Sequence, residues 1–161
     1  MTYYDDIAFS YNELHGEEQK KKVKVILEYL EKQKYSLENK KILDVGCGTG
    51  IATEDFATFG IDPSSELLKQ CNFPTAQANG EKIPFPDKSF DVVICLTAIH
   101  NFDNFKKGTL EIKRAAKEKA IISVLKKAKM YNKIIKEIEN NFNKTKSIDE
   151  EKDTILICSV Q

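Results

Sequence analysis

The sequence has few cysteines and no long hydrophobic run, and these absences exclude several classes of protein. Its four cysteines are widely spaced, and no two form a C-x-x-C pair. This spacing argues against a disulfide framework and a zinc knuckle, so we expect small buried cysteines and no metal site. Residues 1–20 are polar with scattered aromatics and lack the apolar stretch of a signal peptide or a membrane span. We therefore expect a cytoplasmic protein that does not contact a membrane.

Internal repeats and linkers rich in Pro, Gly or Ser are also missing from the 161 residues. A chain of this length, with ordinary apolar and charged fractions, is large enough to cover one sheet on both faces with helices. We expect a single domain over 1–161, with an N-terminal helical lid over 1–38 and a core over 39–161.

Charge is distributed unevenly along the chain, although the formal net charge is zero. Residues 1–105 carry 11 Lys or Arg and 17 Asp or Glu, whereas residues 106–146 carry 13 against 4. A basic segment of this kind can attract an acidic partner or a phosphate backbone, which makes RNA a possible partner. It can equally be the solvated face of a Lys-rich protein, because no aromatic or Arg cluster accompanies it.

Hydrophobic periodicity alternates along the chain between the helical and the strand type. Helices are expected over 17–34, for about two turns over 51–58, after Ser64, over 104–118 and over 131–142. Buried strands are expected over 41–45, 57–61, 74–78, 90–96, 120–125 and 154–160, and 145–149 should pair with the last strand. The fold class is therefore α/β, a doubly wound and mostly parallel sheet with helices on both faces and a C-terminal antiparallel hairpin.

A glycine-rich motif, ILDVGCGTG at 42–50, follows the first expected strand directly. Missing side chains at Gly46, Gly48 and Gly50 let the backbone approach a ligand closely. A dinucleotide fingerprint would need glycine at position 51, where Ile51 stands, and no Gly-Lys-Ser/Thr follows as in a Walker A loop. Asp44 is a poor neighbour for phosphate and a good one for a cation, so the ligand should carry positive charge.

A second acid, Asp62, stands sixteen residues after Gly46, at the end of the second expected strand. A carboxylate in that place can accept hydrogen bonds from both hydroxyls of a ribose. Together, Asp44, the glycines and Asp62 specify a nucleoside with a cationic, amine-bearing tail, for which adenosyl sulfonium is the obvious candidate.

Three segments in succession, ILDVGCGTG, GIDPS and AQANGEKIPFPDKSFDVVICLTAIHNF, resemble the motifs of class I S-adenosylmethionine-dependent methyltransferases. The closest pattern is the methyltransferase type 11 subgroup, which includes the ubiquinone and menaquinone biosynthesis methyltransferases. The resemblance covers roughly residues 2–125. It implies a Rossmann-like fold, S-adenosyl-L-methionine as cofactor and S-adenosyl-L-homocysteine as product.

The resemblance also implies which residues bind the cofactor. Asp44 and the loop would hold the methionine amino and carboxylate groups, Asp62 the ribose, and Asn79 with Gly80 the adenine amino group. Asn79 replaces the usual acid but can still accept that hydrogen bond. The full expected set is Asp44, Gly46, Cys47, Gly48, Gly50, Asp62, Pro63, Asn79, Gly80, Leu96 and Tyr11. Tyr11 belongs to an opening element that would fold over the cofactor, and it can equally be a core aromatic.

His100 is the candidate catalytic residue, because many relatives carry His just beyond the fourth strand. A neutral imidazole can orient the acceptor or take its proton at cellular pH. The alternative is a histidine that hydrogen-bonds the loop and contributes only shape. The shortened helix over 51–58 departs from the family pattern and predicts a thin pocket wall with weak cofactor binding.

The acceptor is less visible in the sequence than the donor, because methyl transfer from a sulfonium depends mainly on orienting the acceptor. The sequence favours a methyltransferase acting on an unidentified acceptor, with RNA or another macromolecule suggested by the basic segment 106–146. Two alternatives stay open: a small-molecule methyltransferase acting on something like a quinone precursor, and a non-catalytic S-adenosylmethionine-binding subunit. An activator subunit can also complete the site.

Overall fold

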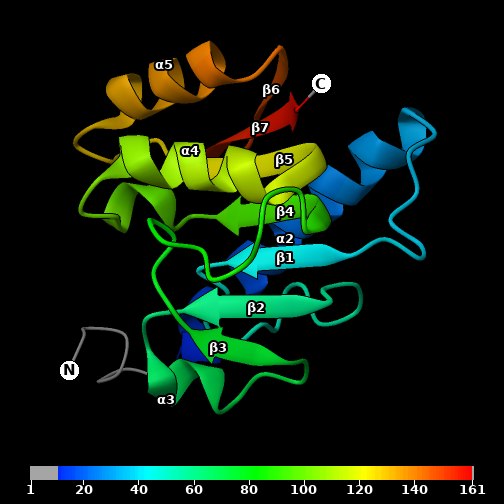
Figure 1. Cartoon of the computed structure of the whole chain (residues 1–161), viewed down its shortest axis with the longest axis vertical. Helices are drawn as coiled ribbons and strands as arrows, with labels where there is room; N and C mark the ends of the chain where they lie inside the picture. Colours follow the sequence, from blue (N-terminus) through cyan, green and yellow to red (C-terminus); the bar gives the residue numbers. More distant parts are fainter. Residues whose placement is uncertain (1–10, 161) are drawn as a thin grey trace.

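The computed structural model describes residues 11–160 and arranges them around a seven-stranded sheet of order β3-β2-β1-β4-β5-β7-β6 (Figure 1). The strands are β1 Ile42–Val45, β2 Phe59–Asp62, β3 Thr75–Gln77, β4 Phe90–Leu96, β5 Ala116–Leu125, β6 Lys144–Asp149 and β7 Asp153–Ser159. The helices are α2 Tyr11–Lys32, α3 Ser65–Leu68, the short 3₁₀ helix η1 Ile99–Asn101, α4 Phe105–Ala115 and α5 Tyr131–Asn141. Strands β1 to β5 pair in parallel, and β7 is antiparallel to both neighbours. The expected α/β fold class is confirmed.

Strand β4 shows why the sheet needs helices on both faces. Its side chains alternate between two apolar clusters: Val93 and Cys95 pack with α4 and α5, whereas Val92 and Ile94 pack with α2. All four are almost inaccessible to water. A parallel strand buried on both faces reads as a continuous apolar run, which is why FDVVICL was correctly predicted as a strand.

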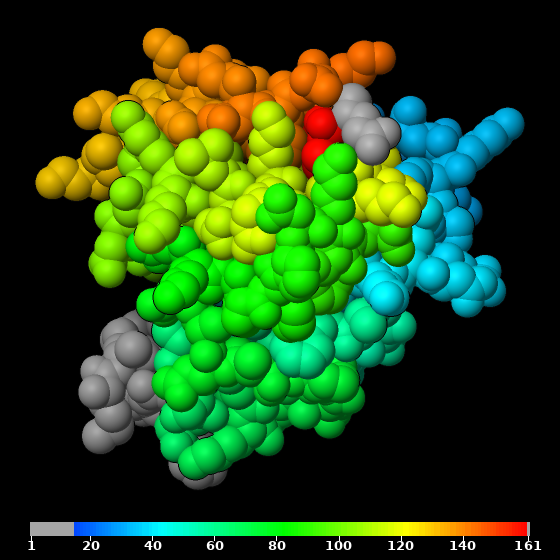
Figure 2. Space-filling model, in the orientation of Figure 1, coloured from blue at the N-terminus to red at the C-terminus, as the bar shows by residue number. Residues whose placement is uncertain are grey.

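Two layers of helix cover the sheet. Ile112 of α4 and Ile138 of α5 fill one face, and the side chains of these helices cover the upper part of the view in Figure 2. On the other face, α2 lays Val23, Ile26 and Leu30 across the central strands. The expected division into a lid over 1–38 and a core over 39–161 stays a prediction.

The helix expected over 51–58 is absent, and this prediction was wrong. Residues 51–56 form successive turns, in which Thr53 N donates to Gly50 O at 3.2 Å and Phe56 N to Thr53 O at 3.0 Å. Thr58 N already donates to Ile42 O at 2.9 Å, so the chain has joined the sheet before a helix can propagate. The free energy that is needed to nucleate a helix exceeds what one or two turns of helix recover.

The helix expected over 104–118 ends three residues early, at Ala115, and no turn separates it from β5. Ala116 pairs with Phe90, and Lys119 with Val92, so these residues extend β5 toward its amino end. Strand pairing therefore overrides the helix preference of AKEK. At the start of α4, Asn104 caps the helix, because its side chain accepts a hydrogen bond from Lys107 N at 3.1 Å.

The C-terminal hairpin was predicted correctly. Strand β6 pairs with β7 from Lys144, opposite Ser159, to Asp149, opposite Thr154, and Glu150 N donates to Asp153 O at 3.0 Å in the turn. Within residues 11–160, no helix is long and apolar enough to cross a membrane.

Candidate functional site

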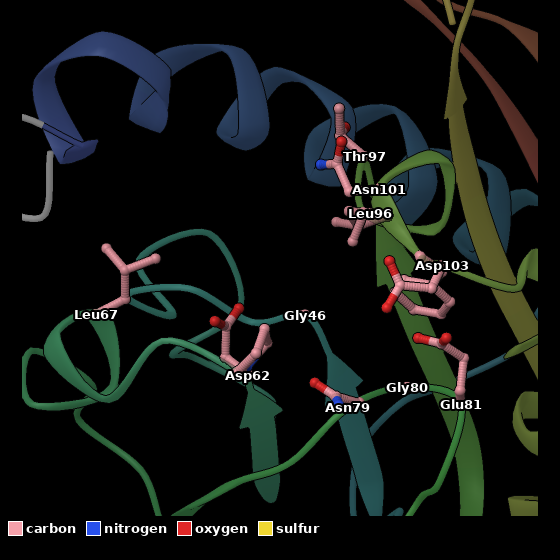
Figure 3. A pocket seen from close by; sticks show the side chains of 13 residues that line it. Gly46, Asp62, Leu67, Asn79, Gly80, Glu81, Leu96, Thr97, Asn101 and Asp103 are labelled. Carbon is pink, nitrogen blue, oxygen red and sulfur yellow. The ribbon is translucent and has the colours of Figure 1, made fainter. Parts of the chain in front are cut away.

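Two adjoining cavities lie at the carboxyl ends of β1, β2 and β4, where ligands of such sheets bind. The larger has a volume of about 260 Å³ and the smaller of about 30 Å³, and Gly46 and Leu96 line both. Figure 3 looks into the larger one. Its lining consists of Gly46, Asp62, Pro63, Leu67, Asn79, Gly80, Glu81, Leu96, Thr97, Ala98, Asn101, Phe102 and Asp103. The smaller is lined by Gly16, Gln19, Asp44, Gly46, Cys47, Thr49, Ile51, Ala52, Thr53 and Leu96.

The glycine-rich loop owes its shape to backbone conformations that favour glycine. Gly46, Gly48 and Gly50 all have positive φ, at 72°, 56° and 72°. At Gly46 there is a second reason for glycine, because a Cβ atom there would lie 2.7 Å from the Cβ atom of Ala98. Gly46 N donates to Ile61 O at 2.8 Å, so the loop folds over the end of β2. Gly48 and Gly50 line neither cavity. Their positive φ angles contribute to the shape of the loop.

Asp62 braces this loop while it lines the larger cavity. Its Oδ2 accepts a hydrogen bond from Gly48 N at 2.9 Å, and its Oδ1 accepts one from Ser64 N at 2.8 Å. The side chain of Ser64 in turn caps α3 by accepting a hydrogen bond from Leu67 N at 3.3 Å. Each carboxylate oxygen can accept more than one hydrogen bond, so bracing the loop is compatible with binding ligand hydroxyls.

Asp44 lies beneath the smaller cavity and is 5% exposed. Burial raises its pKa to about 7; the hydrogen bond from Thr53 Oγ1 to its Oδ2, at 2.6 Å, lowers the pKa, and the charge of Asp62 raises it. The carboxyl group is therefore easily protonated in the ligand-free protein. A cation in the cavity would favour its charged form.

Asn79 and Gly80 line the larger cavity after β3. A Cβ atom on Gly80 would lie 2.3 Å from the ring of Phe102 and 2.9 Å from Val45 Cγ1, so only glycine fits at this point. Glu81 Oε2 accepts a hydrogen bond from Asn104 N at 3.1 Å and links this loop to the start of α4. The cavity wall beside Asn79 is therefore built by backbone close to an aromatic ring.

His100 lies on η1 but lines neither cavity. It is half-buried, and its Nδ1 has no hydrogen-bond partner among the residues that the structure describes. Burial lowers its pKa; the charge of Asp153 raises the pKa and that of Lys22 lowers it. Its catalytic role stays a prediction.

The structure brings most of the expected site residues together. Asp44, Gly46, Cys47, Asp62, Pro63, Asn79, Gly80 and Leu96 line one cavity or both. Tyr11 begins α2, but its side chain lies outside the part that the structure describes.

Sequence reasoning missed Gln19 on α2, together with Thr97, Asn101 and Asp103 beyond β4. A dense polar segment after a buried strand, NFDN at 101–104, was the signal that could have found the last two.

The four cysteines are free thiols. Cys47 belongs to the glycine-rich loop, and Cys71 lies beside this loop. Cys71 Sγ donates to Gly48 O at 3.2 Å. Among residues 11–160, no group of His, Cys, Asp and Glu is arranged to hold a metal ion.

Comparison with known proteins gives one family. The sequence model described as Methyltransferase domain matches residues 43–124. An uncharacterized protein of Methanocaldococcus jannaschii is 35% identical, covering 90% of this chain and 59% of its own length. The ubiquinone biosynthesis O-methyltransferase of Rickettsia conorii is 33% identical, covering 62% of this chain and 39% of its own length. The chain thus spans only part of these relatives.

Solved structures share the fold. A SAM-dependent methyltransferase from Aquifex aeolicus gives a TM-score of 0.70 at 17% identity, covering 86% of this chain and 89% of that one. Magnesium protoporphyrin IX methyltransferase from Synechocystis, crystallised with SAH, gives 0.66 at 16% identity, covering 87% and 82%. A Haloferax volcanii methyltransferase in complex with the Trm112 activator gives 0.63 at 14% identity, covering 76% and 82%. At these identities, the likeness is one of fold.

Proposed function

Because the chain belongs to the methyltransferase domain family, we propose that it binds S-adenosylmethionine in the two adjoining cavities and transfers its methyl group to an acceptor. The observation that carries this proposal is the pair of buried carboxylates, Asp44 and Asp62, one in each cavity. Among the described lining residues there is no Lys or Arg. Such a site attracts a nucleoside with a cationic tail and disfavours phosphate.

Each part of the donor has a proposed neighbour. Asp62 accepts hydrogen bonds from the ribose hydroxyls, and Asn79 and Gly80 contact adenine. Asp44 and the backbone of the loop from Gly46 hold the methionine amino and carboxylate groups. The smaller cavity, with Gln19 of α2 at its edge, receives the methionine end.

The residues of this chain promote transfer mainly by orientation. Bound S-adenosylmethionine supplies a methyl group already activated by its sulfonium charge. Leu96 and Thr97 form the cavity wall where β4 ends, and they would set the direction from which the acceptor approaches. The carboxyl groups of Asp44 and Asp62 are held in place by hydrogen bonds before any ligand arrives, so little reorganisation is needed.

We favour a small neutral or cationic acceptor. Beside Asp62, the carboxylates of Glu81 and Asp103 line the larger cavity, and a polyanion would be repelled there. Quinone-biosynthesis enzymes among the relatives agree with a small acceptor.

RNA is the second candidate, and a third cavity favours it. Lys119, Lys144 and Lys146 line a space of about 380 Å³ that has no Asp or Glu among its described lining residues. This cavity lies at the amino end of β5, away from the donor site, so it would anchor a phosphate backbone rather than the reacting group. An activator subunit, as in the Haloferax complex, remains a further proposal.

Calorimetry with S-adenosylmethionine and with NAD tests the donor site. We expect binding of S-adenosylmethionine alone. Asp62→Ala should weaken it by about 1–3 kcal/mol, because ribose hydroxyls lose their partner. Asn79→Ala, which leaves the braced loop intact, should weaken it less. Asp55→Ala, an exposed acid in the neighbouring turn, is the matched control. Binding of NAD alone would overturn the proposal.

Incubation with tritiated methyl donor and separate pools of RNA, protein and small metabolites then identifies the acceptor. Label in the metabolite pool supports our first candidate, and label in RNA supports the second. Donor binding without label in any pool, with cell extract supplied as a source of a partner subunit, would favour the non-catalytic binding protein. Label that persists in Asp62→Ala combined with Gly48→Arg would mean that this site is not responsible.

A further inference from the structure

A buried charged cluster adjoins the larger cavity: Thr97 lines that cavity, whereas Lys22 and Asp153 line neither cavity of the site. Lys22 of α2 donates a hydrogen bond from Nζ to Thr97 Oγ1 at 2.9 Å, and Nζ lies 3.2 Å from Asp153 Oδ1. Thr97 Oγ1 donates to Asp153 Oδ2 at 2.7 Å. The side chains of Lys22 and Asp153 are only 2% and 0% exposed. One helix, the end of β4 and the start of β7 are thus joined by one set of contacts.

This cluster is costly for the fold. Removing two charges from water is seldom repaid by their attraction, and buried ion pairs are often replaceable by apolar residues without loss of stability. Thr97 is also strained, because its φ is 52°, a conformation that β-branched residues avoid. Strain of this kind persists where surrounding contacts impose it, and it is concentrated at functional sites. Here, the hydroxyl bonds and the bond from Thr97 N to Ser123 Oγ, at 2.8 Å, impose it.

The strained residue lies on the cavity wall. Thr97 follows Leu96, which lines both cavities, and leads into η1, whose Asn101 lines the larger one. Figure 3 shows Leu96, Thr97 and Asn101 together on the side of the cavity away from Asp62 and Leu67. If Asp62 holds the donor's ribose, this wall faces the acceptor.

We propose that Lys22, Thr97 and Asp153 form a positioning cluster that fixes the turn between β4 and η1, and with it the acceptor side of the cavity and His100. The proposal rests on the proposed function for its meaning in catalysis. Among the described residues, the hydrogen bonds of the cluster reach neither Asp44 nor the glycine-rich loop, but Thr97 Oγ1 also lies 3.5 Å from Gln19 Oε1 at the edge of the smaller cavity. We therefore expect a large effect on the acceptor side and a small one on donor affinity.

The charges of Lys22 and Asp153 also affect the pKa of His100. Lys22 from α2 and Asp153 from β7 are the charged groups that act on it among the described residues, and they move its pKa in opposite directions. Their effects oppose each other, and burial then keeps the imidazole neutral, with Nδ1 lacking a partner among those residues. Because His100 lines neither cavity and its Nδ1 is buried, the cluster would hold this imidazole behind the acceptor wall rather than in contact with the acceptor.

The double variant Lys22→Met, Asp153→Leu separates positioning from structural support. Because both charges are removed, we expect unfolding stability equal to that of the wild type or higher, and donor affinity within about threefold. The kcat for methyl transfer should fall about 100-fold, the cost of a misplaced reacting group. Thr97→Ser, which keeps the hydroxyl, should retain activity, whereas Thr97→Val should not. Wild-type kcat in the double variant, or donor affinity lost together with stability, would overturn the proposal.

A second measurement needs no acceptor and no donor. The chain has two histidines, so the NMR titration of His100 can be followed with His15 as internal reference. Lys22→Gln, which keeps a hydrogen-bond donor, should raise the pKa of His100 because Asp153 is left unbalanced. Adding Asp153→Asn should return the pKa toward the wild-type value. An unchanged titration in Lys22→Gln would refute the coupling, whether or not the protein binds S-adenosylmethionine, so this failure is distinguishable from failure of the proposed function.

Discussion

Asp44 is predicted to reduce the stability of the ligand-free protein at neutral pH. Its pKa is raised from the ordinary 3.8 to about 7, mainly by burial. For an acid with a raised folded-state pKa, the unfolded chain ionises first, so folding loses stability as pH rises from about 4 to about 7. A difference of one in pKa between the folded and the unfolded state is worth about 1.4 kcal/mol. The loss of folding stability therefore reaches about 4 kcal/mol above pH 7. Asp44→Asn removes this penalty and keeps an oxygen for the Thr53 hydroxyl.

Urea denaturation without cofactor, between pH 5 and pH 9, measures the difference between Asp44→Asn and the wild type. The variant should gain stability relative to the wild type by about 1.4 kcal/mol per pH unit up to about pH 7, and the gain should then level off. Asp55→Asn makes the same chemical change at an exposed position and is the control.

The same substitution should weaken binding of the cationic donor, because the carboxylate that it attracts is gone. Added S-adenosylmethionine should therefore raise the melting temperature of the wild type more than that of Asp44→Asn, and increasingly so above pH 7. A stability difference that does not change with pH would refute the assignment of the raised pKa to Asp44.

Three other predictions concern packing and the site. Gly80→Ala should lower donor affinity at least tenfold by calorimetry, because its Cβ atom would lie 2.3 Å from the ring of Phe102 and move the cavity wall; unchanged affinity would place the ligand elsewhere. Ile138→Ala should cost about 2–5 kcal/mol in urea denaturation, whereas Leu110→Ala, at a 53% exposed position, should change stability by less than about 0.5 kcal/mol. Asn104→Ala should cost about 1 kcal/mol by removing the cap of α4, and a loss below about 0.3 kcal/mol would contradict that role.

The sequence predicted those parts of the fold whose signal is local. Strand β4 was predicted with its correct bounds, because burial on both faces makes its apolar run continuous. The amino end of β5 was missed, because Ala116 and Lys119 become strand only through pairing with β4, and no local pattern records that pairing. The turns over 51–56 were missed for the same reason, since the early return to the sheet depends on β1.

The sequence likewise predicted some residues of the candidate site and missed others. Asp44 and Asp62 lie at the carboxyl ends of β1 and β2, and the glycines directly follow β1, so their meeting at one edge of the sheet could be inferred. Lys22 could not, because it stands within the run KKKVK on a helix, where lysines normally face water. Its burial depends on Asp153, which is distant in sequence and reaches it only through the hairpin of β6 and β7.

The direct passage from α4 into β5 limits how the cavity can open. With Ala115 ending the helix and Ala116 already paired, no connecting loop is left to act as a hinge at that end of α4. At its other end, Asn104 is tied to Glu81 across the cavity wall. The wall that carries Asp103 is therefore clamped from both directions. The smaller cavity is bounded by Gly16 and Gln19 of α2, which rests on the opposite face of the sheet through side-chain contacts, so widening this cavity would require α2 to move against those contacts, among them the buried pair of Lys22 and Asp153.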